Sequence, residues 1–164
     1  MAKSPLDQLY RRPGFLIRRA HQTAVSIFLE ETGALGITNR QYGILLVLKH
    51  RPGIDQITVA KLLGLDRSTT GMVLAALEKA GFVGRVVGKQ DRRTRSLQLT
   101  KAGERMLTRL AEPARRAQAR VLSAFTAKEQ KTFLDLLEKF AQAFNETSRV
   151  PQVMQLPKKK GLRK

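Results

Sequence analysis

The chain has 164 residues, a length that fits one domain with an added dimerisation element and excludes two independent enzyme domains. Its 31 Lys and Arg residues against 13 Asp and Glu residues give a formal net charge of +18, which points to a polyanionic partner. Because hydrophobic residues make up 42% of the chain, we expect a folded core and not a disordered basic chain throughout.

The rarity of metal-binding and nucleophilic side chains argues against an enzyme or a metalloprotein. The sequence has no Cys, which excludes disulfides, thiolate metal sites and thiol-based redox sensing. Its two His residues, His21 and His50, have no clustered carboxylates beside them, and no phosphate-binding glycine motif is present. We therefore expect no cofactor and no metal. Neither a signal peptide nor an apolar run of about 20 residues is found, so we expect a cytoplasmic protein.

The first part of the chain is predicted to form two helices. Apolar residues recur at helical spacing over residues 13–31, which begin with Pro, a residue suited to a first helical turn. A second helix is predicted to start at Thr38, because Thr38 and Gln41 have the spacing of a capping box. Its body, residues 42–49, is almost wholly apolar and is expected to end before Pro52.

Residues 54–81 have the pattern of a helix-turn-helix. Asp55 is a plausible N-cap for a short amphipathic helix, which a turn at Gly64 ends. Asp66 then caps a second helix that runs to Gly81. Two short helices on a tight glycine turn are typical of this motif.

A charged β-hairpin, or wing, is predicted to follow. Residues 82–87 and 95–99 read as two short strands on either side of the polar loop 88–93. Five basic residues and one acidic residue give the stretch 85–95 a charge of +4. A helix-turn-helix with such a wing is a geometry for duplex DNA, in which the second helix enters the major groove.

The last third of the chain is predicted to form two further helices and a tail. A helical pattern runs from Thr100 to about residue 124, and Pro113 within it is expected to kink or split the helix. Capping-box spacing at Thr126 and Glu129 starts the last helix. Residues 149–164 contain six basic and no acidic residues, so we expect a disordered basic tail.

These elements predict a mainly α fold with a small β-wing, a winged helix-turn-helix with long N- and C-terminal dimerisation helices. The expected parts are an N-terminal arm with the first dimerisation helix (1–36), the DNA-binding domain (37–100), the C-terminal dimerisation helices (101–148) and the tail (149–164). The apolar stripes of the last two helices exceed what a small winged helix needs to cover itself. We therefore expect a two-fold symmetric homodimer.

Three runs resemble the multiple antibiotic resistance regulator (MarR) family: LDRSTT at 65–70, LEKAGFV at 77–83 and DRRTRSLQLTKAG at 91–103. The resemblance extends in element order over residues 13–147. It implies a winged-helix homodimer whose first, fifth and sixth helices form the interface. It also implies a transcription factor, usually a repressor, that a small phenolic or aromatic acid releases from a palindromic operator.

The resemblance also carries over DNA-contact positions on the second helix of the motif and on the wing. Asp91 falls where a carboxylate orients an Arg toward the minor groove, and whether Arg92 or Arg93 enters the groove stays open. The alternative for Ser68 and Thr69 is plain N-capping chemistry, and for Asp91 a turn-forming role. The candidate DNA-contact residues are Thr38, Arg67, Ser68, Thr69, Gly71, Met72, Asp91, Arg92, Arg93 and Arg95.

Three positions of the second helix depart from the family pattern. Thr70 stands where the family usually has a β-branched apolar residue, and Gly71 and Met72 stand where polar or basic residues are common. Arg67 is then the only strong donor to guanine edges, while Met72 offers an apolar surface to thymine methyl groups. We therefore predict an A·T-rich operator that is recognised largely through DNA shape and phosphate contacts.

An effector site is predicted from the first two helices. Arg18 and His21 share one side of the first helix at helical spacing, and the resemblance implies an effector cleft lined partly by these helices. Arg18, His21 and Tyr42 are the candidate contacts to an aromatic carboxylate. The alternative is that Arg18 and His21 are ordinary surface or interface residues.

The sequence as a whole predicts a sequence-specific regulator of transcription that binds double-stranded DNA as a homodimer and is not an enzyme. The expected form is a repressor that a small aromatic or phenolic acid releases from a pseudo-palindromic operator. The alternative is a constitutive architectural or RNA-binding basic protein without effector control, which would bind with a strong salt dependence and little sequence preference.

Overall fold

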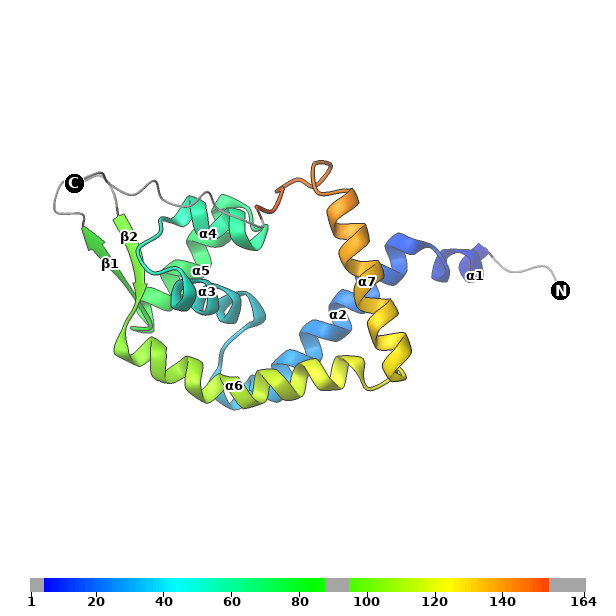
Figure 1. Ribbon diagram of the computed structural model, residues 1–164, viewed down its shortest axis with the longest axis horizontal. Coiled ribbons are helices and arrows are strands. Elements are labelled where there is room, and N and C mark those ends of the chain that lie inside the picture. The colour runs from blue at the N-terminus through cyan, green and yellow to red at the C-terminus, as the bar shows by residue number, and fades with distance from the viewer. Residues whose placement is uncertain (1–4, 88–94, 154–164) are drawn as a thin grey trace.

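A computed structural model of the chain describes residues 5–87 and 95–153 (Figure 1). The described part is mainly helical with a two-stranded wing, which confirms the predicted fold class. Its elements in chain order are α1 (Pro5–Tyr10), α2 (Pro13–Thr32), the 3-10 helix η1 (Gly33–Leu35), α3 (Asn39–His50), α4 (Gln56–Leu63), α5 (Arg67–Lys79), β1 (Val83–Val87), β2 (Arg95–Leu99), α6 (Lys101–Leu122) and α7 (Ala127–Ala143).

Five helices begin at a polar side chain that accepts a hydrogen bond from the backbone N–H three residues later. The caps of α3, α4, α5, α6 and α7 are Thr38, Asp55, Asp66, Thr100 and Thr126. The capping boxes predicted at Thr38 and Thr126 are both complete. Since each cap satisfies an otherwise unpaired N–H, these side chains define where the helices start.

One apolar core joins the helix-turn-helix to the wing and to the start of α6. Its members come from the end of η1 onward through α3, α4, α5, both strands and α6. The buried residues of this core are Ile37, Ile44, Leu45, Leu48, Val59, Leu74, Leu77, Val83, Leu97, Met106 and Leu110. The DNA-binding unit is therefore one packed body and not a loose pair of helices.

The wing is an antiparallel pair with an additional bridge to the segment before α4. β1 and β2 pair in the register Val83↔Leu99 through Val87↔Arg95. Ile54 forms an isolated antiparallel bridge with Leu97, in which the Leu97 N–H donates to the Ile54 carbonyl at 2.8 Å. This bridge, which the sequence did not predict, ties the start of the helix-turn-helix to the base of the wing.

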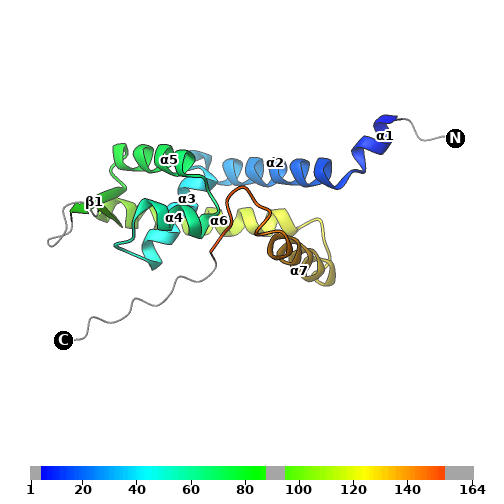
Figure 2. The same ribbon diagram turned by 90° about the horizontal axis from the view of Figure 1, so that it is seen from above.

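The two long helices α2 and α6 pack against each other beyond the winged helix. Phe28 of α2 and the small residues Ala114 and Ala117 of α6 form a second buried cluster there. Glu31 pairs with Arg116 at 2.9 Å (Oε2 to Nε) across the same contact. In both views α6 runs from the winged helix at one end of the molecule toward α7 at the other (Figures 1 and 2).

Pro113 does not split α6, which continues as one helix from Lys101 to Leu122. Of the two expected outcomes, a kink or a split, the split is therefore wrong. Proline removes a single backbone donor, and the neighbouring side chains of Leu110 and Ala114 are buried. Their packing holds the helix together on both sides of the proline.

The chain after α7 turns back to α4, and we call this segment, residues 144–153, the strap (Figure 1). The Val153 N–H donates to the Lys61 carbonyl at 2.9 Å, and the Gln152 Nε2 donates to the Leu62 carbonyl at 2.8 Å. Both acceptors are carbonyls at the end of α4, which have no partner inside a helix. The tail expected from residue 149 is thus folded up to residue 153, and residues 154–164 lie outside the described part of the chain.

Candidate nucleic-acid interface

The first turns of α5 present an exposed face formed by three of the predicted contact residues. Arg67 and Ser68 are exposed, and 66% of Met72 is accessible to solvent. Positions 68 and 72 are one helical turn apart, so their side chains point the same way. Gly71 is half-buried beside them. This face has the residue types and the exposure that contact with a DNA groove requires.

Asp66 uses its carboxylate to organise the start of α5. Its Oδ1 accepts the Thr69 N–H at 2.8 Å, and its Oδ2 accepts the Thr69 hydroxyl at 2.6 Å. The hydroxyl of Thr69, followed by its backbone N–H, holds the pKa of Asp66 below its ordinary value, because both stabilise the ionised form. The Thr69 hydroxyl is therefore already engaged within the protein, in line with the capping interpretation of this residue.

Thr70 is fully buried, and its position explains a departure from the family pattern. Its hydroxyl donates to the Asp66 carbonyl at 2.8 Å, so the buried polar atom has a partner. The methyl group is left to pack in the place that a β-branched apolar residue usually takes. Thr70 thus belongs to the core and not to the exposed face.

Gln56 lies close to the exposed face of α5, a placement the sequence analysis missed. It is the first residue of α4, and its Nε2 donates to the Arg67 carbonyl at 3.3 Å. The same nitrogen lies 3.1 Å from where a Cβ atom on Gly71 would be. Because the two residues are far apart in sequence, no local pattern signals the contact.

The described part of the wing is attached to α5 by an ion pair. Arg85 of β1 donates from Nε to the carboxylate of Glu78, near the end of α5. Arg95 pairs through its backbone with Val87 at the outer end of the hairpin. The predicted contacts Asp91, Arg92 and Arg93 lie outside the described residues.

Thr38 is exposed and serves as the N-cap of α3. Its hydroxyl accepts the Gln41 N–H at 3.3 Å, and its own N–H donates to the Gln41 side chain at 2.8 Å. A structural role for Thr38 is therefore visible, and its contact with DNA stays a prediction.

The three candidate effector contacts do not lie together. Tyr42 packs on Phe28, with ring centroids 5.5 Å apart, and lines a pocket between α3 and α6. His21 lines a different pocket, which α2, α6 and α7 form, and Arg18 lies with its guanidinium 5.0 Å from the ring centroid of Phe15. The predicted effector contacts are thus divided between separate places in the fold. Helical spacing places residues on one face of α2, but it does not determine which end of α2 meets α3.

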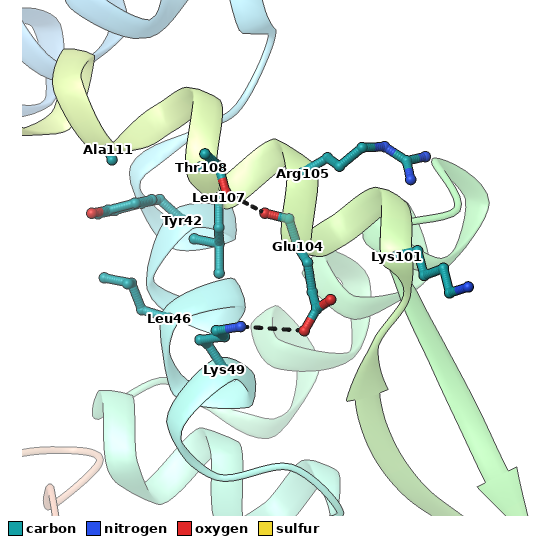
Figure 3. Close-up of a pocket in the computed structure, with 9 residues that line it drawn as sticks. All are labelled: Tyr42, Leu46, Lys49, Lys101, Glu104, Arg105, Leu107, Thr108 and Ala111. Carbon is teal, nitrogen blue, oxygen red and sulfur yellow. Dashed lines mark hydrogen bonds and ion pairs between the residues drawn. The ribbon is translucent and has the colours of Figure 1, made fainter.

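The Tyr42 pocket has a volume of about 640 Å³ and combines apolar and charged side chains. Lys49 Nζ lies 3.2 Å from Glu104 Oε1, so an ion pair spans the pocket between α3 and α6. Leu46 and Leu107 supply apolar surface. Figure 3 shows Lys49 and Glu104 facing each other, whereas the Arg105 guanidinium points away from Tyr42.

The His21 pocket is of similar size, about 590 Å³, and is lined mostly by apolar residues. Large apolar side chains of α2 and α7 that line this pocket or lie near it are exposed. They include Leu16, Ile17, Leu136, Leu137 and Phe140, each at least 46% exposed.

Two further features bear on the class of protein. Among residues 5–87 and 95–153, no group of three or more His, Cys, Asp or Glu side chains is arranged to hold a metal ion. No helix in this described part is both long and apolar enough to span a membrane.

Comparison with known proteins gives the family of the chain. The MarR family model matches residues 37–94, the span from the start of α3 to the wing. An HTH-type transcriptional repressor of Mycobacterium tuberculosis is 31% identical over 136 residues, which cover 83% of this chain and 93% of the relative. The chain belongs to the MarR family. It is a winged helix-turn-helix, DNA-binding regulator of transcription and not an enzyme.

Two solved structures of transcriptional regulators extend the similarity to most of the chain. The PcaV transcriptional regulator from Streptomyces coelicolor, in complex with its natural ligand, is 34% identical with a TM-score of 0.73, over 87% of this chain and 99% of that one. The transcriptional repressor CouR, bound to a 23-mer DNA duplex, is 28% identical with a TM-score of 0.77, over 85% of this chain and 99% of that one.

Proposed function

We propose that this MarR-family protein is a homodimeric repressor that binds a pseudo-palindromic operator and is released by a small aromatic or phenolic acid. The observation that carries the proposal is the exposed first turn of α5, where Arg67 and Ser68 stand free at a helix start ordered by Asp66. The CouR repressor bound to duplex DNA and the ligand-bound PcaV regulator support the two halves of the proposal, DNA binding and ligand response.

The apolar faces of α2 and α7 support the dimer. A monomeric protein rarely exposes many large apolar side chains together. The helices that carry them, α2 and α7, lie toward the end of the molecule away from the wing (Figure 1). A second copy related by a two-fold axis would cover the same surface on both chains. The two α5 helices would then contact half-sites about one DNA turn apart, roughly 34 Å.

The residues on α5 favour an operator rich in A·T pairs. Arg67 is the one strong hydrogen-bond donor on the exposed face described above, and Met72 offers an apolar surface of the kind that meets thymine methyl groups. Phosphate contacts and DNA shape would supply the rest of the specificity. Selection of binding sites from random duplexes tests this, and a site dominated by G·C pairs under α5 would contradict it.

The Tyr42 pocket is the better candidate for an acidic effector. Its apolar side chains suit an aromatic ring, and a carboxylate near Lys49 would compete with Glu104 for the ammonium group. Lys49–Glu104 joins α3 to the first turns of α6, which follow directly on the wing. A ligand that breaks this ion pair would therefore change how α3 packs against the start of α6, next to the wing.

The decisive experiment measures binding to the protein's own promoter fragment at fixed salt with excess competitor DNA, with and without a panel of aromatic acids. The expected result is saturable binding that one acid abolishes. Tyr42→Phe and Lys49→Gln should weaken the response to this acid, whereas Arg18→Ala and His21→Ala should not. Binding that competitor removes under every condition would favour an architectural protein instead.

A further inference from the structure

The exposed face of α5 has one position without a side chain, and a side chain from the neighbouring helix lies over it. A Cβ atom on Gly71 would lie 3.1 Å from Gln56 Nε2 and 4.0 Å from its Cδ. No other atom outside Gly71's immediate neighbours and its own helix backbone comes within 4 Å of that point in the described part of the chain. The carboxamide of Gln56 therefore lies directly against the position where a side chain at residue 71 would begin.

Gln56 is held there by a hydrogen bond to α5. Its Nε2 donates to the Arg67 carbonyl at 3.3 Å, at the first residue of the helix. Positions 67 and 71 are one turn apart and lie on the same side of α5. The amide is thus placed between the backbone of the first turn and the bare backbone of the second, on the side where Arg67 and Met72 are exposed.

Gly71 lowers the stability of α5, and its contact with Gln56 gives a reason for glycine at this position. A glycine inside a helix is about 1 kcal/mol less favourable than alanine. Its φ angle is not positive, so the helix geometry itself does not require glycine here. What the missing side chain provides is room for Gln56.

The carboxamide of Gln56 can still form hydrogen bonds with a base. One N–H of Nε2 is used on Arg67, which leaves the second N–H and the Oε1 acceptor of a half-exposed residue. A carboxamide with one free donor and one free acceptor matches the N7 and N6 edge of adenine in the major groove. No side chain of α5 itself projects from position 71 to do this.

We propose that Gln56 is a specificity-determining residue, which contacts an adenine in each half-site from the place that Gly71 leaves open. This inference rests on the proposed operator binding through α5. It assigns one base contact of the operator to α4, in addition to those of Arg67 and Met72.

The test compares Gln56→Ala, Gly71→Ala and the double variant with the matched control Gln118→Ala, an exposed glutamine of α6 outside the helix-turn-helix. Each protein is measured against the selected operator, against operators with single base-pair changes across both half-sites, and against a random duplex at the same salt. In the wild type, replacing the contacted A·T pair should weaken binding by about 5- to 150-fold.

Gln56→Ala should abolish this discrimination at one base pair in each half-site and leave the other positions unchanged. Gly71→Ala should weaken discrimination at the same base pair, because its Cβ, 3.1 Å from Gln56 Nε2, shifts the amide without removing it. The double variant should then be no worse than Gln56→Ala, since both changes act on one contact. Alanine favours the helix and meets only a flexible side chain, so Gly71→Ala is expected to keep or raise the Tm.

The alternative outcomes are distinct. An equal loss on every duplex would make Gln56 a phosphate contact and overturn base recognition by it. Unchanged discrimination in Gln56→Ala, with a selective wild type, would overturn this inference alone. A Gly71→Ala protein that discriminates like the wild type would overturn the role of Gly71. A wild type without sequence preference would overturn the proposed operator binding as well.

Discussion

Gly103 of α6 lies against the backbone of Phe82, just before the wing, and replacing it with alanine should destabilise the protein. A Cβ atom at this position would lie 2.1 Å from the Phe82 carbonyl oxygen and 3.0 Å from its carbon. Both are backbone atoms, so no side-chain rotation relieves the clash. The same carbonyl accepts the Thr100 N–H at 3.0 Å, and the Thr100 hydroxyl donates to Gly81 at 2.6 Å. Separating α6 from Phe82 would strain these bonds.

The expected loss follows from three contributions. Overpacking costs about 1–3 kcal/mol, and a weakened hydrogen bond adds about 1 kcal/mol. The higher helix propensity of alanine returns up to about 1 kcal/mol. The net loss is then about 2 kcal/mol, which for a chain of this size lowers the Tm by about 4–8 °C.

The matched control is Gly14→Ala, which makes the same change in the first turn of α2. There, among the described residues outside its chain neighbours and its own helix backbone, no atom lies within 4 Å of the new Cβ. Thermal unfolding of both variants is followed at one protein concentration, because the stability of the proposed dimer would depend on concentration. Gly14→Ala should match or exceed the wild type. If Gly103→Ala melts at or above the temperature of Gly14→Ala, the steric reasoning is refuted.

Three further predictions concern charge. Asp66→Asn keeps a cap for the Thr69 N–H and removes a negative charge beside the exposed first turn of α5. Affinity for operator and random duplexes should therefore rise, and unchanged affinity at low salt would contradict this. Arg116 and then Arg120 lower the pKa of Glu31. The ionised Glu31 carboxylate therefore stabilises the folded protein above its ordinary pKa of 4.5, and this stabilisation is lost as the pH falls through the lowered pKa. Glu31→Gln should therefore flatten the acid-side fall of the Tm, and an unaltered Tm profile would exclude this pair. Deleting residues 154–164 should weaken binding to all duplexes alike and reduce the salt dependence; a changed sequence preference would contradict it.

Local patterns predicted most of the fold. The five helix starts depend on a cap and a backbone N–H three residues away, and such pairs can be recognised in the sequence. The two strands of the wing and the glycine turn before α5 are local in the same way. These features were correct because their determinants lie within one or two turns of chain.

Contacts between segments distant in sequence could not be predicted from local patterns. The bridge between Ile54 and Leu97, and the bond from Gln152 to Leu62, join residues far apart in the sequence. The Gln56 contact with α5 depends on how two helices cross, which apolar spacing does not determine. The division of the effector candidates between two pockets has the same cause, since Tyr42 meets Phe28 about two turns away from His21 on α2.

The strap determines the point of the fold from which the basic C-terminal residues 154–164 continue. Without it, the residues after α7 would start at the end of the molecule that carries the apolar faces. Because the Val153 N–H donates a hydrogen bond to the Lys61 carbonyl, the described part of the chain ends beside the helix-turn-helix, and residues 154–164 follow from there. Eleven residues span at most about 36 Å, so the five Lys and Arg residues among them stay within that reach of the Val153 anchor. In the proposed complex with DNA, this anchor would raise the effective concentration of their charges near the phosphate backbone.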